Sequence, residues 1–169
     1  MNHPLTFVVR KLTNVDNEQY RELWWHAVTE HAMFFRISPE DEATKFIPTR
    51  FVADSFTVGA FAGARLLGVV SVERDIRKKM NHKALVFRMF VHPDAAGHGV
   101  GRRLLQQVID DMTKIKNIRY LYLTVLASNK RAIHLYSSLG FKEFAREPHA
   151  VCINGEYVDE LQMALPTRH

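Results

Sequence analysis

Residues 91–105 read VHPDAAGHGVGRRLL, with glycines at the alternate positions 97, 99 and 101. A short apolar strand ending at Val91 leads into this loop, and a helix with an apolar face follows it directly. The first amides of a helix have no partner within the helix, and the helix dipole places positive potential there. Glycines let the backbone approach an anion without a Cβ in the way. The stretch therefore predicts a strand, an anion-binding loop and a helix.

The spacing of the glycines narrows the kind of anion site. A P-loop needs a Gly-Lys pair, which this chain lacks, and a dinucleotide fingerprint would need a third glycine where Arg102 or Leu104 stands. The remaining pattern resembles the pyrophosphate loop of the GCN5-related N-acetyltransferases, which bind coenzyme A. That family usually has Gln or Arg where this chain has Ala96. The alternative interpretation is a glycine-rich turn with no ligand.

A second segment, residues 123–141, resembles the second cofactor motif of the same family. It reads as a strand, a polar cap, a helix, a glycine stop and another strand. The positions that match the motif are Asn129, Ala132, Tyr136, Gly140 and Phe141. A third match is the closing hairpin, for which Asn154-Gly155 is a strong turn signal. The resemblance covers residues 56–165, and its two central motifs together identify the family.

Composition sets the class of protein. The 169 residues, 47% of them hydrophobic, predict one soluble domain over residues 1–169 with no stretch long enough to span a membrane. Met1–Pro4 lacks the pattern of a signal peptide, and the single cysteine, Cys152, is expected to be a small apolar filler. These features predict a cytoplasmic protein. The net charge of +5 and the pI near 9.5 suit a phosphorylated cofactor, with nucleic-acid binding as a weaker alternative.

The hydrophobic periodicity predicts the order β-α-α-β-β-β-α-β-α-β-β. Residues 5–12 should form the first strand, a capping box of Asp16 and Gln19 should begin a helix, and a short second helix should start at Ser38-Pro39. The fold class is α/β (α+β): a single mixed, mostly antiparallel central sheet of about seven strands flanked by helices. The resemblance implies the acyl-CoA N-acyltransferase fold, in which the strand ending at Val91 splays from the strand over residues 120–125.

The resemblance also implies the cofactor site. Backbone groups of Met89, Phe90 and Val91 should pair with the pantetheine arm, to which Asn129 should also bond. The pyrophosphate should lie against the backbone of the loop, which comprises Gly97, His98, Gly99, Val100, Gly101 and Arg102. Tyr136 should donate a hydrogen bond or a proton to the coenzyme A sulfur as it leaves. The alternative interpretations are that Tyr136 is a core aromatic and that Asn129 is a helix cap.

The general base is not given by the motifs. Only about one in a thousand lysine-like amines is neutral near pH 7.4, whereas an N-terminal amine is neutral to a substantial extent. Relatives place a glutamate at the position of Thr124 or of Arg88, and neither residue is acidic here. Glu73 is the nearest acidic alternative and is predicted as the catalytic base. Glu30 or His31, or a chain of water molecules, remains an alternative.

The sequence therefore predicts an N-acetyltransferase that moves the acetyl group of acetyl-CoA, its cosubstrate, to a primary amine of a small molecule or a protein N-terminus. A non-catalytic acyl-CoA-binding module and a basic nucleic-acid-binding protein are the alternatives. The nine histidines show no metal-ligand spacing, so no metal site is expected. The identity of the amine, the acyl-chain preference and a homodimer are left open.

Overall fold

The computed structural model describes residues 5–42 and 46–167. Within these residues seven strands form one sheet in the order β1-β2-β3-β4-β5-β7-β6, antiparallel throughout except for β4 and β5. The strands are β1 (Val8–Lys11), β2 (Ser55–Ala62), β3 (Arg65–Arg74), β4 (Lys83–Val91), β5 (Tyr120–Leu126), β6 (Lys142–Ile153) and β7 (Glu156–Pro166). The helices are α1 (Asn17–Glu30), α2 (Val100–Thr113) and α3 (Lys130–Ser138). The predicted mixed, mostly antiparallel sheet is confirmed.

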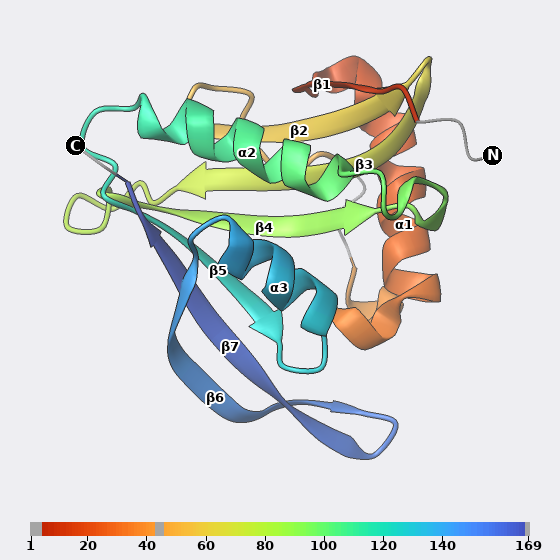
Figure 1. The fold of residues 1–169 in the computed structure, drawn as a ribbon, viewed down its shortest axis with the longest axis vertical. Coiled ribbons are helices and arrows are strands. Elements are labelled where there is room, and N and C mark those ends of the chain that lie inside the picture. The colour runs from red at the N-terminus through yellow and green to blue at the C-terminus, as the bar shows by residue number, and fades with distance from the viewer. Residues whose placement is uncertain (1–4, 43–45, 168–169) are drawn as a thin grey trace.

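The helices lie on both faces of the sheet. Figure 1 shows α2 and α3 in front of the strands, and α1 behind the sheet near the end of β2 and the start of β3. One apolar cluster joins α2 and α3 to the sheet, and a second joins α1 to the opposite face. β2 and β3 are buried along nearly their whole length, because both of their faces are covered. β5 alternates between buried and accessible residues, so one of its faces is largely open.

The helix after the glycine loop forms as its periodicity predicts. α2 turns one face inward, and Leu104, Leu105, Val108 and Met112 on that face are fully buried. Each of these side chains contributes roughly 1.5–3 kcal/mol by leaving water. This burial fixes the start of α2, and with it the glycine loop, against the sheet.

Two predicted elements differ from the structure. The helix expected from Ser38-Pro39 is only a single 3-10 turn, Pro39–Asp41. At its end, the Asp41 carboxylate accepts a hydrogen bond of 2.9 Å from the Ser38 hydroxyl. The first strand covers only Val8–Lys11. Two further 3-10 turns, Asn14–Asp16 and Ala32–Phe34, flank α1, and a fourth, Pro93–Ala95, follows β4.

The sheet is divided by a fork between β4 and β5. These two strands are hydrogen-bonded only at their beginnings, where Lys83–Leu85 pair with Tyr120–Tyr122. Beyond that point they separate, as Figure 1 shows. A register shift between β3 and β4 and the positive φ of +49° at Arg88 mark a bulge in β4 within the separated part. The splay that the family resemblance implied is therefore present.

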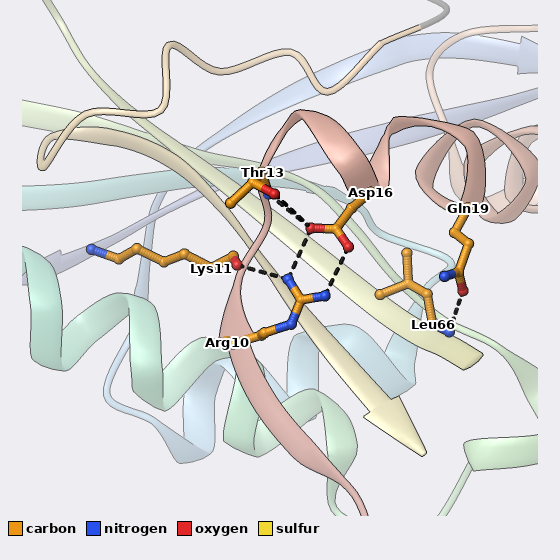
Figure 2. A network of polar contacts seen from close by, with 6 residues as sticks. All are labelled: Arg10, Lys11, Thr13, Asp16, Gln19 and Leu66. Atoms are coloured by element: carbon orange, nitrogen blue, oxygen red, sulfur yellow. Dashed lines mark hydrogen bonds and ion pairs between the residues drawn. The ribbon is translucent and has the colours of Figure 1, made fainter. Parts of the chain in front are cut away.

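The start of α1 is held by a contact network that differs from the predicted capping box (Figure 2). The Asp16 carboxylate accepts two hydrogen bonds of 2.8 Å from the Arg10 guanidinium and one of 2.8 Å from the Thr13 amide. Gln19 does not complete the box, because its side-chain oxygen accepts instead from the Leu66 amide at 2.9 Å. Gln19 therefore ties α1 to β3, a long-range role that the local pattern did not indicate.

We expect Asp16→Asn to destabilise the protein by about 2 kcal/mol, because it removes charge-assisted hydrogen bonds from a buried carboxylate. Hydrogen bonding to Arg10 lowers the pKa of Asp16 below its usual range. A lowered folded-state pKa gives stability that is present above the unfolded pKa of ~3.9 and is lost as pH falls through the folded value. Urea unfolding between pH 7 and pH 2 measures this, and the difference between variant and wild type should shrink below pH 4. Glu143→Gln, which breaks the exposed pair with Arg146, is the control and should cost less than about 1 kcal/mol.

Candidate active site

The glycine loop has the backbone geometry of an anion site. Gly97 and Gly99 have φ values of +81° and +77°, in the left-handed region that favours glycine. Gly99 is the N-cap of α2, and its carbonyl accepts the amide of Arg103 at 3.1 Å. The amides from Gly99 to Arg102 therefore precede the first helical hydrogen bond and carry the positive end of the helix dipole. A Cβ on Gly97 or Gly99 would meet no atom within 4 Å, so the surface over the loop is open.

Gly101 has a different role from the other two glycines. A Cβ at this position would lie 3.1 Å from Cε of Met89 and 3.2 Å from Cδ2 of Leu135. The absence of a side chain therefore lets the first turn of α2 pack directly on β4 and α3. In this way Gly101 brings the loop next to the fork.

The other predicted cofactor residues surround the same end of the fork. His98 is exposed, as expected for a loop tip, and the exposed Arg102 donates to the Ser138 hydroxyl at 2.7 Å, linking α2 to the end of α3. Asn129 is the N-cap of α3, and its side-chain oxygen accepts the Ala132 amide at 3.2 Å. The predicted cap is confirmed. The cofactor roles of these residues stay predictions.

Tyr136 lies under the fork on the side of α2 and α3. Its ring packs edge-on against Phe141, and its hydroxyl donates a weak hydrogen bond of 3.6 Å to Sδ of Met89. Burial raises the pKa of Tyr136 to about 12, so the hydroxyl keeps its proton at neutral pH. A thioether is a weak acceptor, so a thiolate would be a better partner for this hydroxyl. Both interpretations of Tyr136 are compatible: the ring packs in the core while the hydroxyl faces β4.

On the opposite face, α1 and the residues after it cover one side of the fork. At the bulge, Arg88 forms an ion pair of 3.1 Å with Glu42 and lies over the ring of Trp24 at 5.0 Å. The Trp24 indole donates to the other oxygen of Glu42 at 2.7 Å. Trp24 is thus a buried residue that packs between α1 and the bulge. The side chain of Glu42 is buried, and no motif in the sequence singles it out.

A second buried carboxylate lies on the β5 side of the fork. Glu160 in β7 is 1% exposed, and one of its oxygens accepts from Arg36 at 3.0 Å. The hydroxyl of Thr124 also bonds to this carboxylate. Burial is the main cause that raises the pKa of Glu160. The alternation of β7 places Glu160 on the same face as Val158 and Gln162, away from the apolar core, so the pattern alone predicts an exposed residue.

Glu73, the predicted base, lies at the closed end of the fork. It pairs across the sheet with Leu85, which is in the last rung that β4 shares with β5. Its carboxylate accepts from Arg50 at 3.1 Å and from the Ser55 hydroxyl at 3.2 Å. A cavity of about 830 Å³ opens beside it, lined by residues that include Leu85, Phe87 and Tyr122. The catalytic role of Glu73 stays a prediction.

Comparison with known proteins identifies the group to which this arrangement belongs. Residues 17–141 match the family described as the acetyltransferase (GNAT) family. The chain belongs to this family. The match begins at the start of α1 and ends with Phe141, so it includes the fork, the glycine loop and Tyr136.

Individual GNAT relatives are similar over about half of the chain. The chain is 39% identical over 84 residues to ribosomal protein bS18-alanine N-acetyltransferase from Escherichia coli K12, covering 50% of this chain and 56% of that protein. It is 31% identical over 102 residues to spermidine N(1)-acetyltransferase from Vibrio cholerae serotype O1, covering 60% and 57%. The chain therefore spans a little over half the length of the curated relatives it matches.

A solved acetyltransferase structure extends the comparison of the fold to nearly the whole chain. A putative acetyltransferase from Salmonella typhimurium, solved with its cofactor acetyl-CoA, superposes with a TM-score of 0.79 at 21% identity. The superposition covers 96% of this chain and 94% of that one. This likeness confirms the acyl-CoA N-acyltransferase fold predicted from the two central motifs.

Proposed function

We propose that this GNAT protein transfers the acetyl group of acetyl-CoA to a primary amine. The observation that carries the proposal is the convergence of two features on Met89. Its methyl group packs under Gly101 at the start of α2, and its sulfur accepts from the Tyr136 hydroxyl. A phosphate-binding loop and a buried hydroxyl donor thus adjoin the same point of the separated β4 strand.

The residues present fit an acyl-CoA. The amides from Gly99 to Arg102 suit the pyrophosphate, because they point out of a helix N-terminus and each can make a charge-assisted bond of roughly 1.5–3 kcal/mol. Among the described residues no strand lies beside the β4 edge at Met89–Val91 on the β5 side, so its backbone groups suit the amides of the pantetheine arm. The cosubstrate supplies the thioester whose acetyl group is transferred.

Tyr136 suits the stabilisation of the leaving sulfur by a hydrogen bond. A thiol has a pKa of ~8.5, whereas burial raises the pKa of Tyr136 to about 12. The phenol is therefore the weaker acid, and full transfer of its proton to a thiolate would be unfavourable. We infer that Tyr136 donates a hydrogen bond to the thiolate and retains its proton, which refines the two options that the sequence left open.

The acceptor amine would enter from the side of α1. The cavity beside Glu73 offers room for its body, and the lining residues Leu85 and Tyr122 place the cavity at the base of the fork. The relatives above are named for acetylating spermidine at N(1) and an alanine of ribosomal protein bS18, that is, a small amine and a protein. A small amine or a protein N-terminus is accordingly the proposed acceptor class.

The proposal is tested by measuring release of the coenzyme A thiol with spermidine, lysine and a peptide that begins with alanine. Transfer to at least one amine, well above the rate of thioester hydrolysis alone, is the expected result. Binding of acetyl-CoA in calorimetry without transfer to any amine would instead support an acyl-CoA-binding module. Binding of DNA or RNA without binding of acetyl-CoA would support the basic nucleic-acid-binding alternative and overturn the proposal.

We also propose that the protein works in the cytoplasm. Cys152 is exposed on β6, contrary to the apolar filler that the sequence favoured, and it is the single cysteine of the chain. An exposed thiol without a partner suits a reducing compartment. In the described residues no helix is long and apolar enough to cross a membrane.

A further inference from the structure

Glu160 lies at the level of the fork where Met89 meets Tyr136. β4 and β5 share their last rung at Leu85 and Tyr122. Met89 is four residues beyond that rung along β4, and Leu126 is four residues beyond it along β5. Leu126 pairs directly with Glu160 of β7. The carboxylate and the Tyr136 hydroxyl, which bonds to Met89, therefore stand at a similar distance from the base of the fork.

The two groups approach the fork from opposite faces. Leu123 and Val125 of β5 turn toward the core that contains Tyr136. Thr124 and Leu126 alternate with them, so they and Glu160 lie on the other face, on the side of Arg36. A thioester in the fork would have the hydroxyl on one side and the carboxylate on the other. This arrangement separates the leaving sulfur from the side on which the acceptor enters.

The charges around Glu160 make it a suitable proton acceptor. Arg36, from the segment after α1, holds one oxygen at 3.0 Å, and Thr124 of β5 donates to the carboxylate. Glu147 of β6 stands directly opposite Glu160 in the sheet and adds like charge. Burial outweighs Arg36, so the pKa of Glu160 is raised. A carboxylate with a raised pKa holds a proton more strongly, and paired acidic residues attract an ammonium group.

We propose that Glu160 is the general base that removes the proton from the acceptor ammonium. The inference rests on the proposed acetyl transfer. The Glu160 carboxylate takes one proton from R–NH₃⁺, and the freed lone pair forms the C–N bond with the thioester carbonyl carbon. The C–S bond breaks, and the thiolate leaves with its hydrogen bond from Tyr136. The second nitrogen proton goes to solvent, and Glu160 returns its proton to water.

The position of Glu73 is less suitable for this step. Glu73 is level with Leu85, and because of the bulge at Arg88, Met89 lies opposite the stretch between Val69 and Ser71. Met89 is therefore about three residues from Glu73 along β3, which corresponds to roughly 10 Å. Its carboxylate accepts from Arg50 and Ser55, much as that of Glu160 accepts from Arg36 and Thr124, so the position along the fork is what separates the two residues. Glu73 can therefore contact the body of an acceptor in the adjoining cavity, whereas Glu160 lies nearer to the level of Met89 and the Tyr136 hydroxyl, where the thioester would be.

The test compares Glu160→Gln with Glu73→Gln and with the surface control Glu143→Gln, which removes only an exposed pair with Arg146. The acceptors are a lysine-like amine and a peptide N-terminus. Glutamine retains the shape and can still accept from Arg36, but it cannot take a proton. We expect Glu160→Gln to lower kcat/KM for the lysine-like amine by roughly 100-fold at pH 7, with a smaller loss for the N-terminus. Glu143→Gln should remain within about threefold of the wild type, and any loss in Glu73→Gln should be the same at every pH. The loss should shrink as pH rises toward the acceptor pKa of ~10.4, while acetyl-CoA affinity stays unchanged.

A full-activity Glu160→Gln variant, or a loss that is the same at every pH, would overturn the assignment. A pH-dependent loss in Glu73→Gln alone would assign the base to Glu73. If Glu160→Gln does not fold, Glu160→Asp is used in its place, because aspartate keeps a carboxylate at a changed distance. This variant must have lower turnover than the wild type, and its rate must fall at low pH as the wild-type rate does. Wild-type turnover is measured in the same series, so failure of the proposed function is seen separately as an inactive wild type.

Discussion

Tyr136→Phe should lower turnover by between ten and a thousandfold while leaving the affinity for acetyl-CoA nearly unchanged. The substitution keeps the buried ring and its edge-on contact with Phe141, and it removes only the hydroxyl that bonds to Met89. A hydrogen bond to a charged group in a buried site contributes most when charge develops on the leaving sulfur. The loss should therefore appear in kcat rather than in binding.

Steady-state kinetics and calorimetry on the same preparations measure this prediction. Tyr120→Phe is the matched control, because it removes a phenol hydroxyl from an exposed tyrosine at the start of β5. The pH profile adds a second criterion. Since the pKa of Tyr136 is raised to about 12, no ionisation of this residue should appear in the rate below about pH 11. Equal turnover in Tyr136→Phe and wild type would leave the residue a packing role only.

Gly99→Val should reduce the affinity for coenzyme A by at least about 100-fold, equivalent to ~2.7 kcal/mol. The valine side chain would stand in the open space over the loop, where the first amides of α2 face outward. Loss of two charge-assisted bonds to phosphate is sufficient for an effect of this size. The φ of +77° at Gly99 adds backbone strain to any side chain there, so the control must carry the same strain.

Gly63→Val provides that control. Gly63 lies in the turn between β2 and β3 with a φ of +57°, and a Cβ there would also meet nothing within 4 Å. Both variants should lose a similar amount of stability in thermal unfolding, but only Gly99→Val should lose coenzyme A in calorimetry. Unchanged affinity in folded Gly99→Val would end the assignment of this loop to the cofactor. Gly101→Val is a poorer probe, because its side chain would also press on Met89 and Leu135.

The two central motifs could be recognised from sequence because their chemistry is local. Gly97 and Gly99 are required by the backbone angles of one loop, and Asn129 caps the helix that it begins. The order of the elements followed from the same kind of local signal. Gln19 shows the limit of such signals, because its partner is the Leu66 amide on another strand and not the end of its own helix.

The acceptor side of the site could not be predicted in the same way. Strand alternation places Glu160 on the outward face of β7, and the residue that pairs with its carboxylate, Arg36, is 124 residues away in sequence. Glu42 is likewise buried by Arg88 and Trp24 from two other elements. Glu73 is the nearest acidic residue on the neighbouring strand, and its pairing with Leu85, which sets its position along the fork, depends on strand register that the sequence does not show.

The fork also has a mechanical consequence. Because β4 and β5 share only three residue pairs, the sheet consists of two half-sheets, β1 to β4 and β5 to β7, that meet at a narrow seam. A ligand lying along that seam would contact both halves and bind only when they are correctly aligned. Binding would therefore raise the free energy of unfolding of the protein, by an amount that grows with the logarithm of the ligand concentration. A cosubstrate bound in this opening would therefore also act as a structural bridge between the two half-sheets.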